Sequence, residues 1–123
     1  MTQLQSGFVE ANAAHLYYES AGTGYPLVML HGHLIDSRQW DDPFTAFAPS
    51  YRVVRYDARG FGQSTQPPVP FAYHEDLAAV LRFLSIKRAY LMGCSGGGAT
   101  IIDFALTHPE MVAAVYQAEP LIR

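Results

Sequence analysis

The chain has 123 residues, of which 50% are hydrophobic and 15% are charged, and its formal net charge is −3. This size and composition predict one globular domain with a single core and exclude an intrinsically disordered chain. The eight basic residues are scattered along the sequence, so no nucleic-acid partner is expected.

The cellular setting follows from three further features. The single cysteine, Cys94, excludes an internal disulfide and fits a reducing compartment. Residues 1–10 lack a basic segment followed by an apolar one, so no signal peptide is expected. The longest apolar runs, such as residues 27–30, are too short to span a bilayer. We therefore expect a cytoplasmic protein without a membrane partner.

The chain begins with strand-like segments. Residues 8–10 and 15–19 predict two short strands joined by a hairpin turn at Asn12. Residues 22–26 are rich in glycine and predict a loop. Residues 27–30 are continuously apolar, which is typical of a strand buried on both faces of a parallel sheet.

A helix is predicted next, and either Asp36 or Ser37 can cap it. Its apolar face has helical spacing and consists of Trp40, Phe44 and Phe47. Pro43 is expected to kink or split this helix. Residues 51–56 predict another strand, which ends at Asp57.

The second half continues the alternation of strands and helices after a Gly/Pro-rich loop over residues 60–70. A helix with the apolar stripe Leu77, Val80, Leu81 and Leu84 precedes a strand over residues 88–92. The following helix is predicted to turn Ile101, Ile102, Ala105 and Leu106 inward and to end before His108. Residues 112–117 form the last predicted strand. This alternation predicts an α/β fold with a parallel sheet.

The most informative motif is Gly-Cys-Ser-Gly-Gly at residues 93–97, between a predicted strand and a predicted helix. A G-x-S-x-G sequence in that context is a nucleophile elbow, which presents an activated serine, here Ser95. Gly93 and Gly97 supply the small residues that the close approach of strand and helix requires. Cys94 cannot be the nucleophile of the same turn, because Met92 would occupy the small position before it. The alternative is a plain strand-to-helix loop.

Four motifs in order give the chain its family resemblance. They are residues 31–32 (His-Gly), residues 57–64 (Asp-Ala-Arg-Gly-Phe-Gly-Gln-Ser), the elbow, and residues 108–110 (His-Pro-Glu). With these motifs the whole of residues 1–123 resembles the N-terminal part of a single α/β-hydrolase domain, most similar to its serine esterase, lactonase and aminopeptidase branch. The resemblance implies a mostly parallel sheet of about six strands with flanking helices, lacking the cap and the last two strands.

The resemblance also implies an oxyanion hole formed by the backbone N–H groups of His33 and Gly96. Branches with an aspartate nucleophile, including haloalkane dehalogenases and most epoxide hydrolases, are disfavoured because the elbow residue is Ser95. His31 and the segment around Arg59 are interpreted as scaffold rather than chemistry.

The remaining catalytic groups are expected outside this chain, because family members place the histidine, and usually the acid, after later strands. Asp103 lies about 12 Å along its helix from Ser95 and His108 about 20 Å, too far for either to bond the serine. Glu119, just past the last predicted strand, is a possible acid, the alternative being an ordinary loop carboxylate. The His33 side chain is the one local candidate for a base, the alternative being a role for its backbone alone.

The expected function is hydrolysis of a carboxylic ester, lactone or amide through an acyl-enzyme on Ser95, with no metal and no organic cofactor. One alternative is a non-enzymatic binding or assembly module that retains the elbow, and another is a cofactor-free perhydrolase-type enzyme. Besides a small-molecule substrate, the expected partner is the C-terminal half of the domain or a second copy. The last strand, residues 112–117, would be the edge through which the chain associates.

Overall fold

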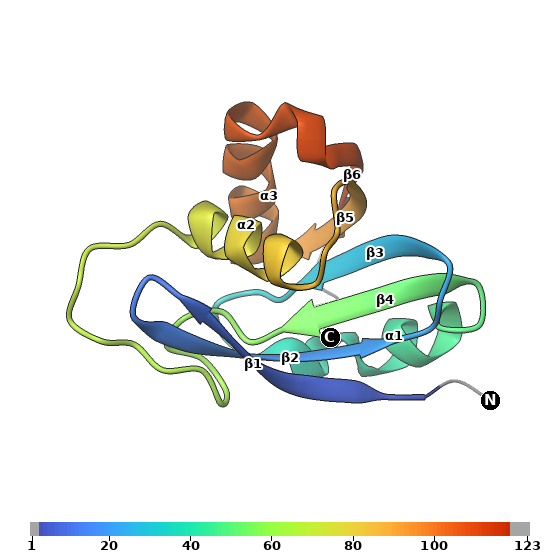
Figure 1. Ribbon diagram of the computed structural model, residues 1–123, viewed down its shortest axis with the longest axis horizontal. Helices are drawn as coiled ribbons and strands as arrows, with labels where there is room; N and C mark the ends of the chain where they lie inside the picture. The colour runs from blue at the N-terminus through green and yellow to red at the C-terminus, as the bar shows by residue number, and fades with distance from the viewer. Residues whose placement is uncertain (1–2, 119–123) are drawn as a thin grey trace.

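The computed structural model describes residues 3–118, which form one six-stranded sheet with helices on both faces (Figure 1). The strands are β1 (Gln5–Ala11), β2 (Ala14–Ala21), β3 (Tyr25–Leu30), β4 (Tyr51–Tyr56), β5 (Ala89–Cys94) and β6 (Val112–Ala118). The helices are η1 (Ser37–Trp40), α1 (Asp41–Phe47), α2 (Tyr73–Phe83), α3 (Gly96–Thr107) and η2 (Pro109–Met111). The predicted α/β architecture is confirmed.

The strand order is β1-β2-β4-β3-β5-β6. The β1–β2 and β2–β4 pairs are antiparallel, whereas β4, β3, β5 and β6 pair in parallel. The hairpin turn between β1 and β2 falls at Asn12 (φ 43°) and Ala13 (φ 72°), the positive φ pair of a tight hairpin. The predicted loop before β3 is shorter than expected, because Tyr25 and Pro26 already belong to the strand.

The predicted helix around Pro43 is split into η1 and α1. Asp36 caps η1, where its carboxylate accepts the backbone N–H of Arg38 at 3.0 Å. Pro43 lies in the first turn of α1, where its missing N–H leaves no helical hydrogen bond unmade. Trp40 and Phe44 are buried as predicted, while Phe47 is 37% exposed.

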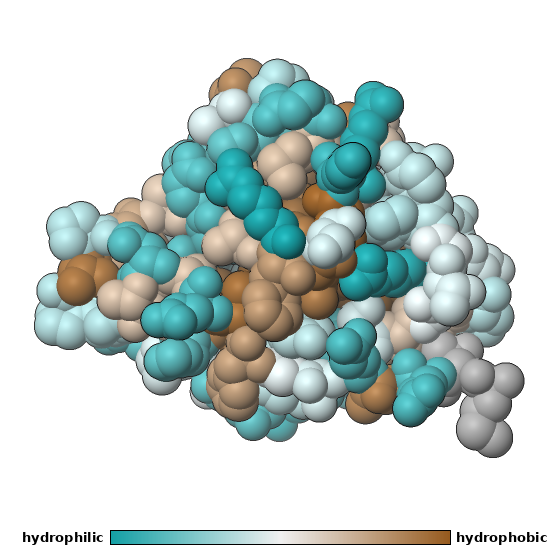
Figure 2. All heavy atoms as spheres, in the orientation of Figure 1, coloured by the Kyte–Doolittle hydropathy of each residue, from teal (hydrophilic) through white to brown (hydrophobic). Residues whose placement is uncertain are grey.

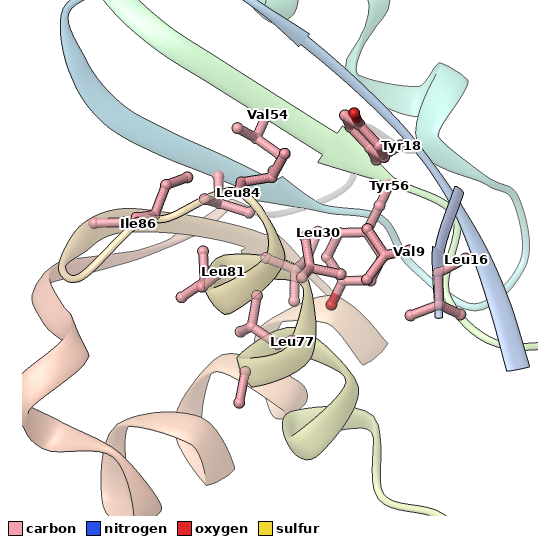
Figure 3. Packing of buried hydrophobic residues seen from close by; sticks show 14 of the residues in the cluster. Val9, Leu16, Tyr18, Leu30, Val54, Tyr56, Leu77, Leu81, Leu84 and Ile86 are labelled. Atoms are coloured by element: carbon pink, nitrogen blue, oxygen red, sulfur yellow. The ribbon is translucent and has the colours of Figure 1, made fainter. Parts of the chain in front are cut away.

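The core has two parts, one on each face of the sheet. The larger part lies between the sheet and helices α2 and α3, where Leu77 and Leu81 approach Leu30 and Tyr56 (Figure 3). The smaller part lies between the sheet and α1 and includes Trp40. Full burial of a large aliphatic side chain contributes about 1.5–3 kcal/mol, so these layers hold the sheet between its helices.

The inward face of α3 differs from the prediction. Ile101 and Phe104 are fully buried, but Ile102 is 48% exposed and Leu106 is 79% exposed. Gly97 also packs inward, so the buried residues of α3 are Gly97, Gly98, Thr100, Ile101 and Phe104 rather than a stripe of the longest aliphatic residues. The elbow decides how α3 is rotated about its own axis. The helix contacts the end of β3 through Gly97, where a side chain would collide with the carbonyl oxygen of Leu30.

Some of the exposed apolar side chains belong to the last strand and to the helix before it. Val115 and Tyr116 of β6 and Ile102 and Leu106 of α3 are exposed. On the face drawn in Figure 2, hydrophilic residues predominate, and some hydrophobic residues are exposed near the middle. In the described part of the chain β6 has one neighbouring strand, β5, so its other edge is unpaired.

Candidate active site

The candidate site lies where the carboxyl ends of β3 and β5 meet. These two strands are parallel neighbours, with Leu27 opposite Tyr90 and Leu30 opposite Gly93. After β3 the chain continues to β4 on one side, then crosses to β5 on the other. The loops after β3 and β5 therefore lead away in opposite directions, and such a switch point is where ligands bind in open α/β sheets.

Ser95 occupies the turn between β5 and α3 with φ 54° and ψ −115°. A serine in this region of backbone space is strained by about 1–3 kcal/mol. Ser95 is exposed, while Cys94 before it and Gly97 after it are buried. The backbone at Ser95 therefore has the strained, outward-facing conformation that a nucleophile elbow requires.

The glycines around Ser95 permit contact between α3 and the sheet. A Cβ atom on Gly93 would lie 2.7 Å from the carbonyl carbon of Gly97. A Cβ atom on Gly97 would lie 2.7 Å from the carbonyl oxygen of His31 and still closer to that of Leu30. Both neighbours are backbone atoms, so no side-chain rotation can make room. Gly98 differs, because its Cβ would only touch the Gln117 side chain at 3.4 Å.

We expect Gly97→Ala to destabilise the fold by about 1–3 kcal/mol, because the added methyl group forces α3 away from β3. The matched control is Gly98→Ala, in the same helical turn, which should be neutral or stabilising because alanine favours the helix. Urea unfolding of both variants measures the difference. Equal midpoints for the two variants would contradict the packing argument.

Two residues next to Ser95 carry the backbone N–H groups of the predicted oxyanion hole. Gly96 is the first residue of α3, where N–H groups lack helical acceptors and the helix dipole favours negative charge. His33 lies in the loop after β3, which touches the elbow: a Cβ on Gly32 would lie 3.4 Å from Ser95 Cβ. Within residues 3–118 the His33 N–H donates no hydrogen bond to a backbone carbonyl. This arrangement is compatible with the oxyanion hole predicted from the sequence.

The imidazole of His33 is held by aromatic rings. It stacks on Phe61 at a centroid distance of 4.9 Å and contacts Tyr73 at 4.7 Å. It also covers Gly96, whose Cβ would lie 2.7 Å from His33 Cγ. Burial, reinforced by nearby His31, lowers the pKa of His33 below 6.5. Among the described residues no hydrogen bond joins this ring to Ser95, and the role of the His33 side chain stays a prediction.

We expect His33→Phe to reduce the loss of stability in acid. Because the pKa of His33 is lower in the folded protein, the unfolded chain binds a proton first as the pH falls below 6.5, and folding is weakened. Phenylalanine keeps the aromatic stacking without this titration. Urea unfolding at pH 7.5 and pH 5.5 should therefore show a smaller pH effect in the variant. An equal effect in both proteins would contradict this expectation, and loss of Ser95 reactivity would assign the base role to the imidazole.

His31 and Asp57 support the loops beneath this site. His31 Nε2 accepts the backbone N–H of Ala58 at 2.8 Å, and Nδ1 donates to the carbonyl oxygen of the next residue at 2.7 Å. The Asp57 carboxylate accepts the backbone N–H groups of Ser37 and Gln63, each at 2.9 Å. These contacts join the loops after β3 and β4, in agreement with the scaffold interpretation of both segments.

Arg59 is fully buried and pairs with Asp76 of α2 through two hydrogen bonds of 2.9 Å. Its guanidinium also donates to the carbonyl oxygens of Ala11 and Asn12 in the first hairpin. It lies over the Phe71 ring at 4.6 Å. The bonds to Asp76 raise the pKa of Arg59. One side chain thus joins the hairpin, the loop after β4 and α2.

The other candidate residues lie away from Ser95 or outside the described residues. Asp103 is exposed on α3, and His108 at the end of that helix bonds Glu75 through Nε2 at 3.0 Å. Glu119, the possible acid, lies outside the described residues.

Among residues 3–118, no three histidine, cysteine, aspartate or glutamate side chains converge as metal ligands. In the same part of the chain, every helix is too short or too polar to span a bilayer.

Two residues that bond the loops after β3 and β4 were not singled out by the sequence. Asp76, the partner of Arg59, is one of two acidic residues in the first turn of α2, a pattern that only indicates a helix start. Gln39 of η1 contacts both the loop after β3 and the end of β5. Neither residue belongs to a recognisable motif, so only the tertiary contacts reveal them.

Comparison with known proteins agrees with this geometry. A Synechocystis protein provisionally named as a non-heme chloroperoxidase is 35% identical over 93 residues, covering 72% of this chain and 34% of that protein. The soluble epoxide hydrolase of Corynebacterium sp. is 29% identical over 108 residues, covering 85% of this chain and 38% of that enzyme. The chain thus spans less than half the length of these curated relatives.

Among solved structures, Est816, described as an N-acyl homoserine lactone degrading enzyme, matches with a TM-score of 0.87 at 32% identity. The match covers 90% of this chain and 44% of that one. The family model for the alpha/beta hydrolase fold matches residues 25–121. The switch-point site and the nucleophile elbow agree with this match. The chain therefore belongs to the alpha/beta hydrolase family.

Proposed function

We propose that this chain supplies the nucleophile and oxyanion hole of a serine hydrolase that cleaves a carboxylic ester, lactone or amide. The observation that carries the proposal is the strained, exposed Ser95 at the N-terminus of α3. The proposed catalytic histidine lies outside this chain, and Glu119 is our candidate for the acid. The lone buried Cys94 makes the cytoplasm the proposed setting.

In the proposed reaction, Ser95 Oγ attacks the carbonyl carbon of the substrate while the histidine takes its proton. The carbonyl oxygen becomes an oxyanion that accepts the N–H groups of Gly96 and His33. Losing one such donor typically costs about 2.7–4 kcal/mol of transition-state stabilisation. The C–O or C–N bond then breaks, and the leaving group takes the proton from the histidine. Water repeats these steps on the acyl-enzyme and releases the acid.

The choice of substrate class is supported by the nucleophile and by one relative. A serine forms an acyl-enzyme with a carbonyl substrate, which suits esters, lactones and amides. Est816, at 32% identity, is described as degrading a lactone. The epoxide hydrolase among the relatives is less similar, at 29%, and its family branch is the one that an elbow serine disfavours.

A perhydrolase-type reaction is the second candidate, favoured by the 35% identity to a protein named as a chloroperoxidase. The same acyl-enzyme on Ser95 would then react with hydrogen peroxide instead of water and release a peracid. The two candidates share their first half-reaction and differ only in the acyl acceptor. Peracid formation from an ester with added hydrogen peroxide separates them.

Labelling with a fluorophosphonate, followed by peptide mass spectrometry, tests the serine mechanism in the full gene product. We expect one adduct, on Ser95. Ser85 is the matched control, because it also has a positive φ, 57°, but follows α2 instead of preceding a helix. Labelling of Ser85, or no labelling of any serine, would overturn the proposal. The second result would favour the non-enzymatic module.

We further propose that the unpaired edge of β6 joins the remaining part of the hydrolase domain. The chain spans less than half of its curated relatives, and the exposed Val115 and Tyr116 offer an apolar edge. Self-association of the isolated chain through the same edge is the alternative. Analytical ultracentrifugation of residues 1–123 with and without the rest of the gene product distinguishes the two.

A further inference from the structure

Gln39 makes two contacts that the motifs around Ser95 do not account for. Its carboxamide oxygen accepts the backbone N–H of Gly32 at 2.8 Å. Its carboxamide nitrogen donates to Cys94 Sγ at 3.4 Å. Gly32 immediately precedes His33, and Cys94 immediately precedes Ser95. One side chain therefore joins the two segments that carry the proposed oxyanion donors.

We propose that Gln39 is a positioning residue that holds the loop after β3 against the elbow, so that the two oxyanion donors keep a fixed separation. This inference rests on the proposed function. Oxyanion stabilisation needs donors placed within about 0.5 Å of the productive geometry. The Gly96 N–H is fixed by α3, but the His33 N–H belongs to a loop and needs a second support.

Gln39 lies in a turn that is held by its own hydrogen bonds and by the core. Its backbone N–H donates to the carbonyl oxygen of Asp36 at 3.0 Å, which closes the turn of η1. Asp36 caps the same turn, and the Arg38 guanidinium beside it lowers the pKa of that carboxyl group. Trp40, which follows Gln39, is buried in the smaller part of the core. The carboxamide is thus presented from a turn anchored at both ends.

The peptide groups on both sides of Gly32 are held by hydrogen bonds. The Gly32 N–H is occupied by Gln39, and its carbonyl oxygen is occupied by His31 Nδ1 and by the Ile35 N–H at 3.3 Å. The His33 N–H shares a planar peptide group with the Gly32 carbonyl, so the bonds to that oxygen, together with the Gln39 bond on the preceding peptide group, set the direction of the His33 N–H. Without Gln39 the Gly32 N–H would lose its partner, and the loop could turn this group instead toward the substrate oxygen.

The first measurement is amide hydrogen exchange at Gly32 in the full gene product. Gln39→Met keeps the side-chain length but removes both hydrogen bonds, so we expect exchange at Gly32 to rise about tenfold. Gln39→Glu keeps an oxygen acceptor and should retain most of the protection. Gln63→Met is the matched control, because Gln63 is exposed and its side chain makes no hydrogen bond within residues 3–118. Unchanged exchange in Gln39→Met would overturn the inference.

The second measurement separates positioning from folding. In fluorophosphonate labelling of Ser95, Gln39→Met should lower the maximal rate by about 10- to 100-fold and leave the half-saturating concentration unchanged. Cys94→Ala removes only the Sγ acceptor and should have a smaller effect in the same direction. The double variant should be no slower than Gln39→Met alone, because both changes break one connection. A labelling rate equal to that of the unsubstituted protein, or two independent effects, would overturn the inference.

The outcomes distinguish this inference from the proposed function. If the unsubstituted protein is not labelled at Ser95, the proposed function fails, and exchange at Gly32 alone decides whether Gln39 holds the loop. If Ser95 is labelled equally fast in the protein and in Gln39→Met, the proposed function stands and the positioning role fails.

Discussion

Ser95→Ala is expected to lower the rate of ester hydrolysis in the full gene product by about 10⁴-fold or more, because no acyl-enzyme can form. The oxyanion donors of Gly96 and His33 would remain, so a small residual rate above that in water is expected. Turnover of a nitrophenyl ester measures this loss, and Ser85→Ala is the control. Activity that survives Ser95→Ala would show that another group is the nucleophile.

Ser95→Gly should lose activity to the same extent but gain stability. Both variants lack the hydroxyl group, yet only glycine adopts φ 54° and ψ −115° without steric cost. We expect the glycine variant to be more stable than the alanine variant by about 1 kcal/mol in urea unfolding. Such a gain would mean that the backbone strain at the elbow is retained for function. Equal stabilities would show that the turn holds no strain.

Arg59→Met is expected to reduce the free energy of unfolding by about 3–5 kcal/mol. The substitution leaves the Asp76 carboxylate, which is almost fully buried, without its two hydrogen bonds. It also leaves the carbonyl oxygens of Ala11 and Asn12 without these donors. Urea unfolding measures this loss of stability. The substitution should also loosen the first hairpin.

The control for this prediction is Arg82→Met, on the exposed side of α2, which should change stability by no more than about 0.5 kcal/mol. Adding Asp76→Asn to Arg59→Met removes the uncompensated charge and should recover part of the loss. If Arg59→Met and Arg82→Met unfold at the same urea concentration, the buried pair does not hold these segments together.

Most strands and helices of the fold could be predicted from the sequence because each carries its own periodic signal. The strand β4 has the predicted bounds, Tyr51–Tyr56, and the split between η1 and α1 follows from Pro43. The inward face of α3 could not be predicted in the same way. Ile102 and Leu106 belong to an apolar stripe, but the contact of Gly97 with β3 rotates them outward.

By itself, the sequence determined the order of the elements and the position of the elbow, since Gly93, Ser95 and Gly97 are close in the chain and their spacing is local. Only the tertiary structure decided which distant groups meet. Gln39 reaches Cys94 across 55 positions, and Arg59 reaches Asp76 across 17. Such contacts leave no periodic trace, because each depends on how two separate segments approach after the sheet has formed and not on the neighbours of either residue.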